Sequence, residues 1–233
     1  MKKVIVIYLL NALLSSAFAI GGFGLQLGQG IFSVSESSPE SGISGVTLTN
    51  SAFDGSYNIG GYAYIDLIPL VDIELDFTLI GGNNYDINFE NQFGSMETIA
   101  FGWGYSNYYM TATKKLLGIG IPFLASAKAH YGLGLNNFKT SPLASIEMVK
   151  QLLGGTDTGL QTGDIDNLDE ALLSYLENDD NLIESSGFHV QAGFQFKVLT
   201  FDTFLLYRHT FIEDVVPGSS GFGALNFRLG LGI

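Results

Sequence analysis

The chain has 233 residues, of which 46% are hydrophobic and only 14% are charged, and its formal net charge is −13. A soluble domain usually has about 25% charged residues, and an acidic chain has the wrong sign of charge for binding nucleic acid. The absence of cysteine excludes disulfides, thiolate chemistry and a lipoprotein anchor. No apolar run of about 20 residues follows residue 19, so the sequence does not predict a helical membrane protein either.

Residues 1–19 have the features of an export signal. Two lysines give a positive start, residues 4–14 are mostly apolar, and Ala17 and Ala19 form a small-x-small cleavage site. We therefore expect cleavage after Ala19, which leaves residues 20–233 as one barrel domain. An uncleaved membrane anchor is the alternative, but the apolar stretch is too short to span a bilayer of about 30 Å as a stable helix.

Eight segments of the mature chain are predicted to be β-strands. In the clearest of them, apolar residues alternate with polar or small ones, which gives the strand one apolar face. In chain order the segments are residues 22–34, 56–67, 72–79, 99–113, 123–135, 188–198, 203–212 and 224–233. About ten residues are enough to cross a membrane as a tilted strand. Because lipid tolerates no unpaired strand edge, we expect an all-β fold: an eight-stranded antiparallel up-and-down transmembrane β-barrel.

The connections between these segments alternate in length. Short turns are predicted at residues 68–71, 114–121 and 199–202, and long connections at residues 35–55, 81–98, 136–186 and 213–221. Outer-membrane barrels have short periplasmic turns and long outer loops, so the long connections are expected outside the cell.

The longest connection, residues 136–186, is predicted to be an extracellular loop that contains two short helices. Ser141 and Pro142 are typical of a helix start, and apolar residues then recur at helical spacing up to the glycine pair at 154–155. A second helix is expected from Asp166. Because helices this short are marginal alone, their apolar faces should pack on each other, on the barrel mouth or on a partner.

The long connections also hold most of the negative charge, with 18 of the 23 acidic residues by these boundaries. We interpret them as a solvated surface rather than as a specific cation site, and divalent cations at these acidic loops stay open as partners. Asp164 and Asp166 resemble the opening of an EF-hand loop, but the next oxygen ligand and the required glycine are missing.

Aromatic residues near the strand ends are expected to form two interfacial girdles. The predicted outer girdle is Tyr57, Phe101, Trp103, Tyr131, Phe188, Phe211 and Phe222, and the predicted inner one is Phe23, Tyr109, Phe123 and Phe201.

The polar strand faces are expected to fill a narrow lumen, because eight strands enclose a space just large enough for side chains. Buried charges of both signs should pair there, so we predict a structural charge network inside the barrel. Its expected members are Asp66, Glu74, Asp76, Lys128, His130, Lys197, Arg208 and Arg228. The inward direction of Arg208 depends on the register chosen at Leu205 and Leu206.

A soluble barrel such as a lipocalin is the main alternative fold, since alternation alone does not tell inside from outside. The near absence of lysine and glutamate on any continuous solvent face argues against the soluble form. His130, Ser126 and Glu74 could be imagined as a catalytic triad, but no enzyme motif accompanies them. No catalytic residue, cofactor or metal site is therefore predicted, and we expect a protein that is not an enzyme.

The last segment carries a more specific resemblance, because Leu225, Phe227, Leu229, Leu231 and Ile233 alternate to the end of the chain. With this last strand and the predicted arrangement of eight strands, the chain resembles the small outer-membrane barrels of the OmpA-barrel, OmpX and OmpW class. In that class the last strand is recognised by the barrel assembly machinery and usually ends in Phe or Trp. The resemblance implies a location in the bacterial outer membrane, with outer-membrane lipid and the assembly machinery as partners.

Fold does not choose between the roles found in this class. The first hypothesis is a non-enzymatic barrel with a structural or surface-interaction role through its acidic outer loops. The alternatives are a narrow, porin-like transport protein for small or hydrophobic solutes and a lipid-modifying enzyme. Conductance separates the first two, and lipid mass spectrometry would reveal the third.

Overall fold

The computed structural model describes residues 21–37, 45–55, 57–68, 71–121 and 124–232. Eight antiparallel strands form a closed ring in it, in which each strand pairs with the next and the last pairs with the first. They are β1 (Gly21–Ile31), β5 (Tyr57–Ile68), β6 (Val71–Asn91), β8 (Ile99–Ile121), β9 (Ala125–Thr140), β10 (Ile183–Val198), β11 (Phe201–Phe211) and β12 (Gly221–Gly232). The predicted ring of eight antiparallel strands is confirmed.

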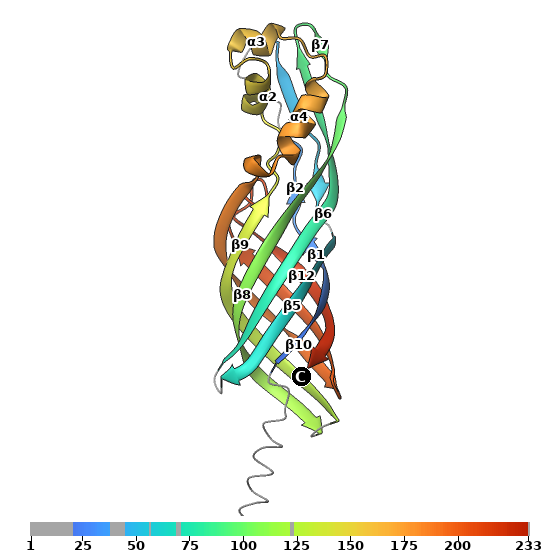
Figure 1. Cartoon of the computed structure of the whole chain (residues 1–233), viewed down its shortest axis with the longest axis vertical. Helices are drawn as coiled ribbons and strands as arrows, with labels where there is room; N and C mark the ends of the chain where they lie inside the picture. Colours follow the sequence, from blue (N-terminus) through green and yellow to red (C-terminus); the bar gives the residue numbers. More distant parts are fainter. Residues whose placement is uncertain (1–20, 38–44, 56, 69–70, 122–123, 233) are drawn as a thin grey trace, which may run out of the picture.

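The ring is narrow and strongly staggered. Following the paired residues once around it from Gly21 leads back to β1 at Ile31, a shift of ten residues along that strand. Such a stagger tilts the strands, as Figure 1 shows for the lower part of the molecule. A ring of eight tilted strands leaves an interior that side chains can fill.

Several strands are longer than the sequence predicts, because pairing continues into segments expected to be connections. β6 reaches Asn91 and also pairs with β3 (Thr47–Asn50) and β7 (Gly94–Ser95), so the predicted connection 81–98 is mostly sheet. β8 continues through residues 114–121, where a turn was expected, and β9 reaches Thr140. At the other end of β1, the strand stops at Ile31, and a separate short pair forms between β2 (Ser33–Val34) and β4 (Phe53–Asp54).

A bulge in β6 explains why its second half does not resemble the first. The register of β6 against β8 shifts by one residue between Ile80 and Asn83. Below the shift, odd-numbered residues such as Phe77 are exposed on the outside of the ring, whereas above it odd-numbered residues such as Tyr85 are buried. One extra residue moves the apolar side chains from the outer face to the inner face.

The connection between β9 and β10 contains three short α-helices within the described residues, not two. They are α2 (Ile146–Leu152), α3 (Asp157–Thr162) and α4 (Leu168–Glu177), and the 3-10 turn η1 (Asp179–Asn181) follows them. The predicted start at Ser141 is wrong, because Ser145 caps α2 and accepts a hydrogen bond from the Met148 amide. The Ser141 hydroxyl instead accepts a hydrogen bond of 3.0 Å from the Gly104 amide and so holds the chain against β8.

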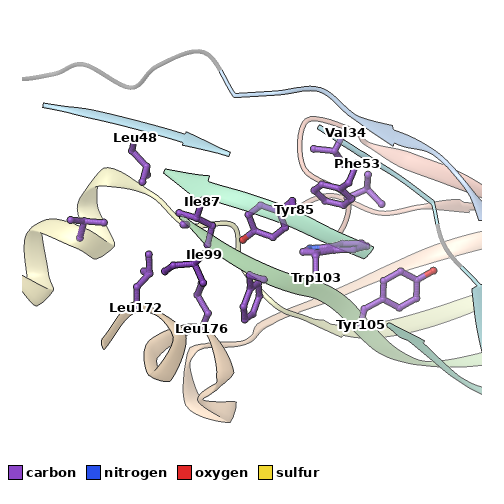
Figure 2. Close-up of a cluster of buried hydrophobic side chains, with 14 of the residues drawn as sticks. Val34, Leu48, Phe53, Tyr85, Ile87, Ile99, Trp103, Tyr105, Leu172 and Leu176 are labelled. Atoms are coloured by element: carbon purple, nitrogen blue, oxygen red, sulfur yellow. The ribbon is translucent and has the colours of Figure 1, made fainter. Parts of the chain in front are cut away.

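The largest hydrophobic core lies beyond one end of the ring. The upper parts of β6 and β8 (residues 81–104), together with β3, β7 and residues 141–182, form a structure that we call the cap (Figure 1). Figure 2 shows its interior, where aromatic and aliphatic side chains of the sheet face the leucines of α4. Fully buried members are Leu48, Tyr85, Ile87, Phe89, Trp103, Leu160, Leu172 and Leu176.

The outer face of the ring is apolar on all eight strands. Exposed large side chains include Leu25, Ile59, Leu75, Met110, Leu133, Phe194, Leu205 and Phe227. Of the predicted girdle residues, Phe101, Trp103, Tyr109 and Phe222 are buried instead, because odd positions of β8 face inward and Phe222 belongs to the core next to the cap. Phe123 lies outside the described residues, as do residues 1–20 with the predicted cleavage site, and Ile233. None of the described helices has the length and hydropathy needed to cross a membrane.

Candidate functional site

The candidate site is a group of buried charged and amide side chains at the middle of the ring. Alternation along each strand points every second residue inside, so β6 contributes Glu74 and Asp76, β11 contributes Arg208 and β12 contributes Arg228. The side chains of all four are at most 5% exposed. Charges withdrawn from water to this degree must be paired and hydrogen-bonded to be tolerated.

Arg228 is the centre of this group. Its Nη1 donates to Glu74 Oε2 at 2.8 Å, and its Nη2 donates to Asp76 Oδ1 at 2.5 Å. Its Nε donates to Gln26 Oε1 of β1 at 2.7 Å. One guanidinium therefore joins β12 to β6 and to β1, and the fixed fork of donors suits two neighbouring carboxylates.

Arg208 completes the group from the next strand. Its Nη2 donates to Asp76 Oδ2 at 2.5 Å, so Asp76 accepts hydrogen bonds from both arginines. Its Nε donates to Gln191 Oε1 at 3.0 Å, and Gln191 Nε2 donates to Glu74 Oε2 at 2.9 Å. Two carboxylates and two guanidiniums balance in charge, and Gln26 and Gln191 add hydrogen bonds to the arginines and to Glu74.

Aromatic rings hold the two guanidiniums in place. The Arg208 guanidinium carbon lies 3.8 Å from the centroid of the Tyr109 ring, and that of Arg228 lies 4.9 Å from the Tyr62 ring. Cation–π contacts of this kind stabilise a cation that has lost its water. The chemistry of the group is therefore that of a permanent, neutral network.

A second polar group lies nearer the end of the ring that is away from the cap. The Tyr64 hydroxyl donates to Asp202, and Gln195 Nε2 donates to the other oxygen of the same carboxylate at 3.1 Å. Lys128 and Asp66 approach to 3.8 Å, and both side chains are partly exposed.

The structure divides the eight predicted network residues into unequal parts. It brings Glu74, Asp76, Arg208 and Arg228 into direct contact, and it places Lys128 and Asp66 in a separate pair. Lys197 lies opposite Asp202 in the register of β10 and β11. His130 is turned inward against Phe204, with a distance of 6.0 Å between the ring centroids.

Sequence reasoning missed Gln26, Tyr62, Tyr109 and Asp202 as parts of these groups. The alternation of β1, β5 and β11 could have found the first, second and fourth of them, since each occupies an inward position. Tyr109 was assigned to a girdle because β8 has aromatic residues at both odd and even positions, so its alternation does not show which face points inward.

The imagined catalytic triad does not form. His130 Nε2 has no hydrogen-bond partner among the described residues. The Glu74 carboxylate is engaged by Arg228 and Gln191 instead. Over the described part of the chain, no group of three or more His, Asp or Glu side chains is arranged to hold a metal ion.

The chain resembles known proteins only distantly. No protein-family model matches the chain, and no curated protein matches it either. Solved structures that match are small outer-membrane β-barrels at low sequence identity. The outer membrane protein OprG of Pseudomonas aeruginosa is 9% identical, with 92% of this chain and 95% of that chain covered and a TM-score of 0.46.

Two further matches have lower TM-scores. Neisserial surface protein A is 12% identical, with 91% of this chain and 97% of that chain covered and a TM-score of 0.38. Ail, the attachment invasion locus protein of Yersinia pestis, matches in a complex with the heparin analogue sucrose octasulfate. It is 12% identical, with 91% and 95% covered and a TM-score of 0.36. None of these matches assigns the chain to a specific family.

Proposed function

We propose that the protein is a non-enzymatic outer-membrane barrel with a structural or surface-interaction role. The observation that carries the proposal is the apolar outer face, which every strand of the ring contributes to. Soluble proteins rarely expose contiguous apolar patches larger than a few hundred Å². A transmembrane barrel requires such a band around its whole circumference, with polar residues inside.

The filled interior favours a structural role over that of an open pore. The Asp76 carboxylate of β6 meets Arg208 of β11 and Arg228 of β12 across the lumen. A network that ties opposite walls together resists deformation of the ring, and the space it fills is no longer open to solutes.

The cap is the part suited to surface interaction. Residues 141–182 contain nine acidic residues and one lysine, and they lie at the end of the ring where the long connections gather (Figure 1). By the general rule for bacterial barrels, this end faces the outside of the cell. The same proposal includes cleavage of residues 1–19 as a signal, export of residues 20–233 as one domain, and assembly through β12.

Two measurements on one preparation test it. Purified outer membranes should contain the protein, and it should migrate faster on a gel before boiling than after, as folded barrels do. Protease added to intact cells should cut within residues 141–182 and leave the ring in the membrane. Recovery in the soluble fraction would refute the membrane barrel, and cleavage only after the outer membrane is opened would reverse the orientation.

A further inference from the structure

A groove crosses the outer face of the ring where most of that face is convex. It has a volume of about 640 Å³, within the range of about 300–1,000 Å³ that is typical of small-molecule sites. Its walls are outward side chains of β1, β5, β6, β8 and β9, among them Phe23, Leu75, Phe77, Tyr108 and Leu135. Phe77 and Tyr108 pack with ring centroids 5.0 Å apart and form one continuous side.

The groove exists because β5 carries two small residues at outward positions. Gly61 and Ala63 line it, whereas Ile59 and Ile65 on the same face of the strand are large and exposed. A Cβ atom at Gly61 would meet only the Gly24 carbonyl oxygen, at an ordinary contact distance of 3.6 Å. The hollow is therefore a property of the side chains chosen there and can be filled by substitution.

One end of the groove leads to a lysine. Leu135 and Asn137 of β9 line it, and Lys139 is the next outward residue of that strand, about 7 Å further toward the cap. The Lys139 ammonium is 4.0 Å from Glu184, an exposed partner at the limit of an ion pair. A 4.0 Å contact with an exposed carboxylate leaves this cation able to bind a second anion.

Lys139 is isolated among the basic residues that the structure describes. Four of them, Lys128, Lys197, Arg208 and Arg228, lie inside the ring. Lys150 belongs to the cap and pairs with Asp157 at 2.7 Å. Lys114 and Lys115 lie at the opposite end of the ring. At the rim next to the cap, Lys139 is the single cation on the outer face in the described chain.

We propose that this groove binds one acyl chain of an anionic phospholipid, whose negatively charged headgroup contacts Lys139. The inference rests on the proposed membrane location, because only then is the groove at the depth of lipid tails and Lys139 at the depth of headgroups. The acidic cap would repel the same headgroup everywhere else on this side, so the lysine fixes where such a lipid can sit. A basic residue near anionic lipid contributes about a five-fold preference.

The test uses the full-length mature protein in nanodiscs of phosphatidylcholine and phosphatidylglycerol with identical chains, in equal amounts. Faster gel migration of the unheated protein first verifies insertion for every variant. Native mass spectrometry after release then counts the retained lipids. Wild type should retain one lipid with about a five-fold preference for phosphatidylglycerol.

The variants separate the two parts of the site. Lys139→Gln should retain lipid without headgroup preference, whereas Gly61→Leu and Ala63→Leu should lose the retained lipid. The matched controls are Lys114→Gln, an exposed lysine at the other end of the ring, and Ala192→Leu, an exposed alanine on β10. Both controls should behave as wild type.

Inserted wild type that retains no lipid, or groove variants that retain it unchanged, would overturn the inference and leave the membrane barrel standing. A mass of two chains that returns to one chain in Gly61→Leu would also overturn it, because a second copy would then occupy the groove. Failure of wild type to insert would refute the proposed function and this inference together.

Discussion

At the scale of single residues, the interior of the ring depends on Arg228. Its guanidinium is fully buried and contacts Glu74 and Asp76 of β6 and Gln26 of β1. Desolvation of the two carboxylates is offset only while the arginines remain beside them. Both arginines hydrogen-bond a carboxylate and a neutral amide, and both carboxylates accept from at least one guanidinium, so no charge of the group is left without an opposite charge.

Replacing Arg228 by alanine should therefore be costly. Glu74 would lose its ionic partner and Asp76 one of two, so the free energy of unfolding should fall by roughly 3–5 kcal/mol, as when one member of a buried pair is removed. The free energy of unfolding is measured in vesicles across a series of urea concentrations, from the fraction of protein that migrates slowly on a gel because it is unfolded. Lys114→Ala, at an exposed position, is the control and should change it by less than about 1 kcal/mol. Equal urea midpoints for the two variants would contradict the network's role.

Tyr85 gives the cap a dependence on alkaline pH. Burial raises the pKa of its hydroxyl from 10.0 to about 12. The unfolded form loses this proton first, so the stability that Tyr85 contributes to the cap should be fully present below pH 10 and should be lost between about pH 10 and 12. Trp103, the single tryptophan, reports the transition because Phe53 packs against both rings, at centroid distances of 5.5 and 5.4 Å. Tyr85→Phe should flatten this pH dependence, and an unchanged profile would rule the group out.

The inward direction of these residues was predictable, but their partners were not. Alternation in β6 and β12 places Glu74, Asp76 and Arg228 on the polar face, and the expectation of a membrane barrel turns that face inward. Which inward residues meet depends on the stagger around the ring, and Glu74 and Arg228 are 154 residues apart. No local pattern fixes that stagger, because it is set jointly by all eight pairings.

At the scale of elements, side-chain alternation in the sequence predicts that a strand exists, but it does not predict where the strand ends. The alternation in β6 resumes beyond Gly81 with Tyr85, Ile87 and Phe89, yet a bulge reverses the face on which it lies. Glycines and asparagines at the bulge resemble a loop in sequence, so the continuation of the sheet stays hidden. α3 is missed for a different reason, since Leu160 is its only buried side chain and two turns cannot show a period.

The cap should unfold separately from the ring. Leu172 of α4 is fully buried in the cap core, and its truncation to alanine should lower the stability of the cap by about 2–5 kcal/mol. Trp103 fluorescence in urea should report an earlier transition, while the heat-dependent gel shift of the ring stays unchanged. Ser174→Ala, at an exposed position of the same helix, is the control. A joint loss of both signals would show that cap and ring form one cooperative unit.

At the scale of the whole molecule, two layers close the lumen. The charge network crosses it at mid-height, and above it Tyr105, Tyr109, Phe138 and Phe222 pack ring against ring with centroids 5.0–5.7 Å apart. The aromatic layer continues directly into the cap core. A hydrated ion would have to break charge pairs in the first layer and displace packed rings in the second.

Planar bilayers containing the purified protein should therefore show no large, steady conductance. The Arg228→Ala variant should also stay closed, because Arg208 and Asp76 still bridge the lumen and the aromatic layer is untouched. Opening should require loss of the second layer too, so a Phe138→Ala and Phe222→Ala pair added to Arg228→Ala is the variant expected to admit ions. The protein-free control is the bilayer with detergent alone. Porin-like conductance from the wild-type protein would refute the filled lumen, and with it the structural role assigned to the buried charges.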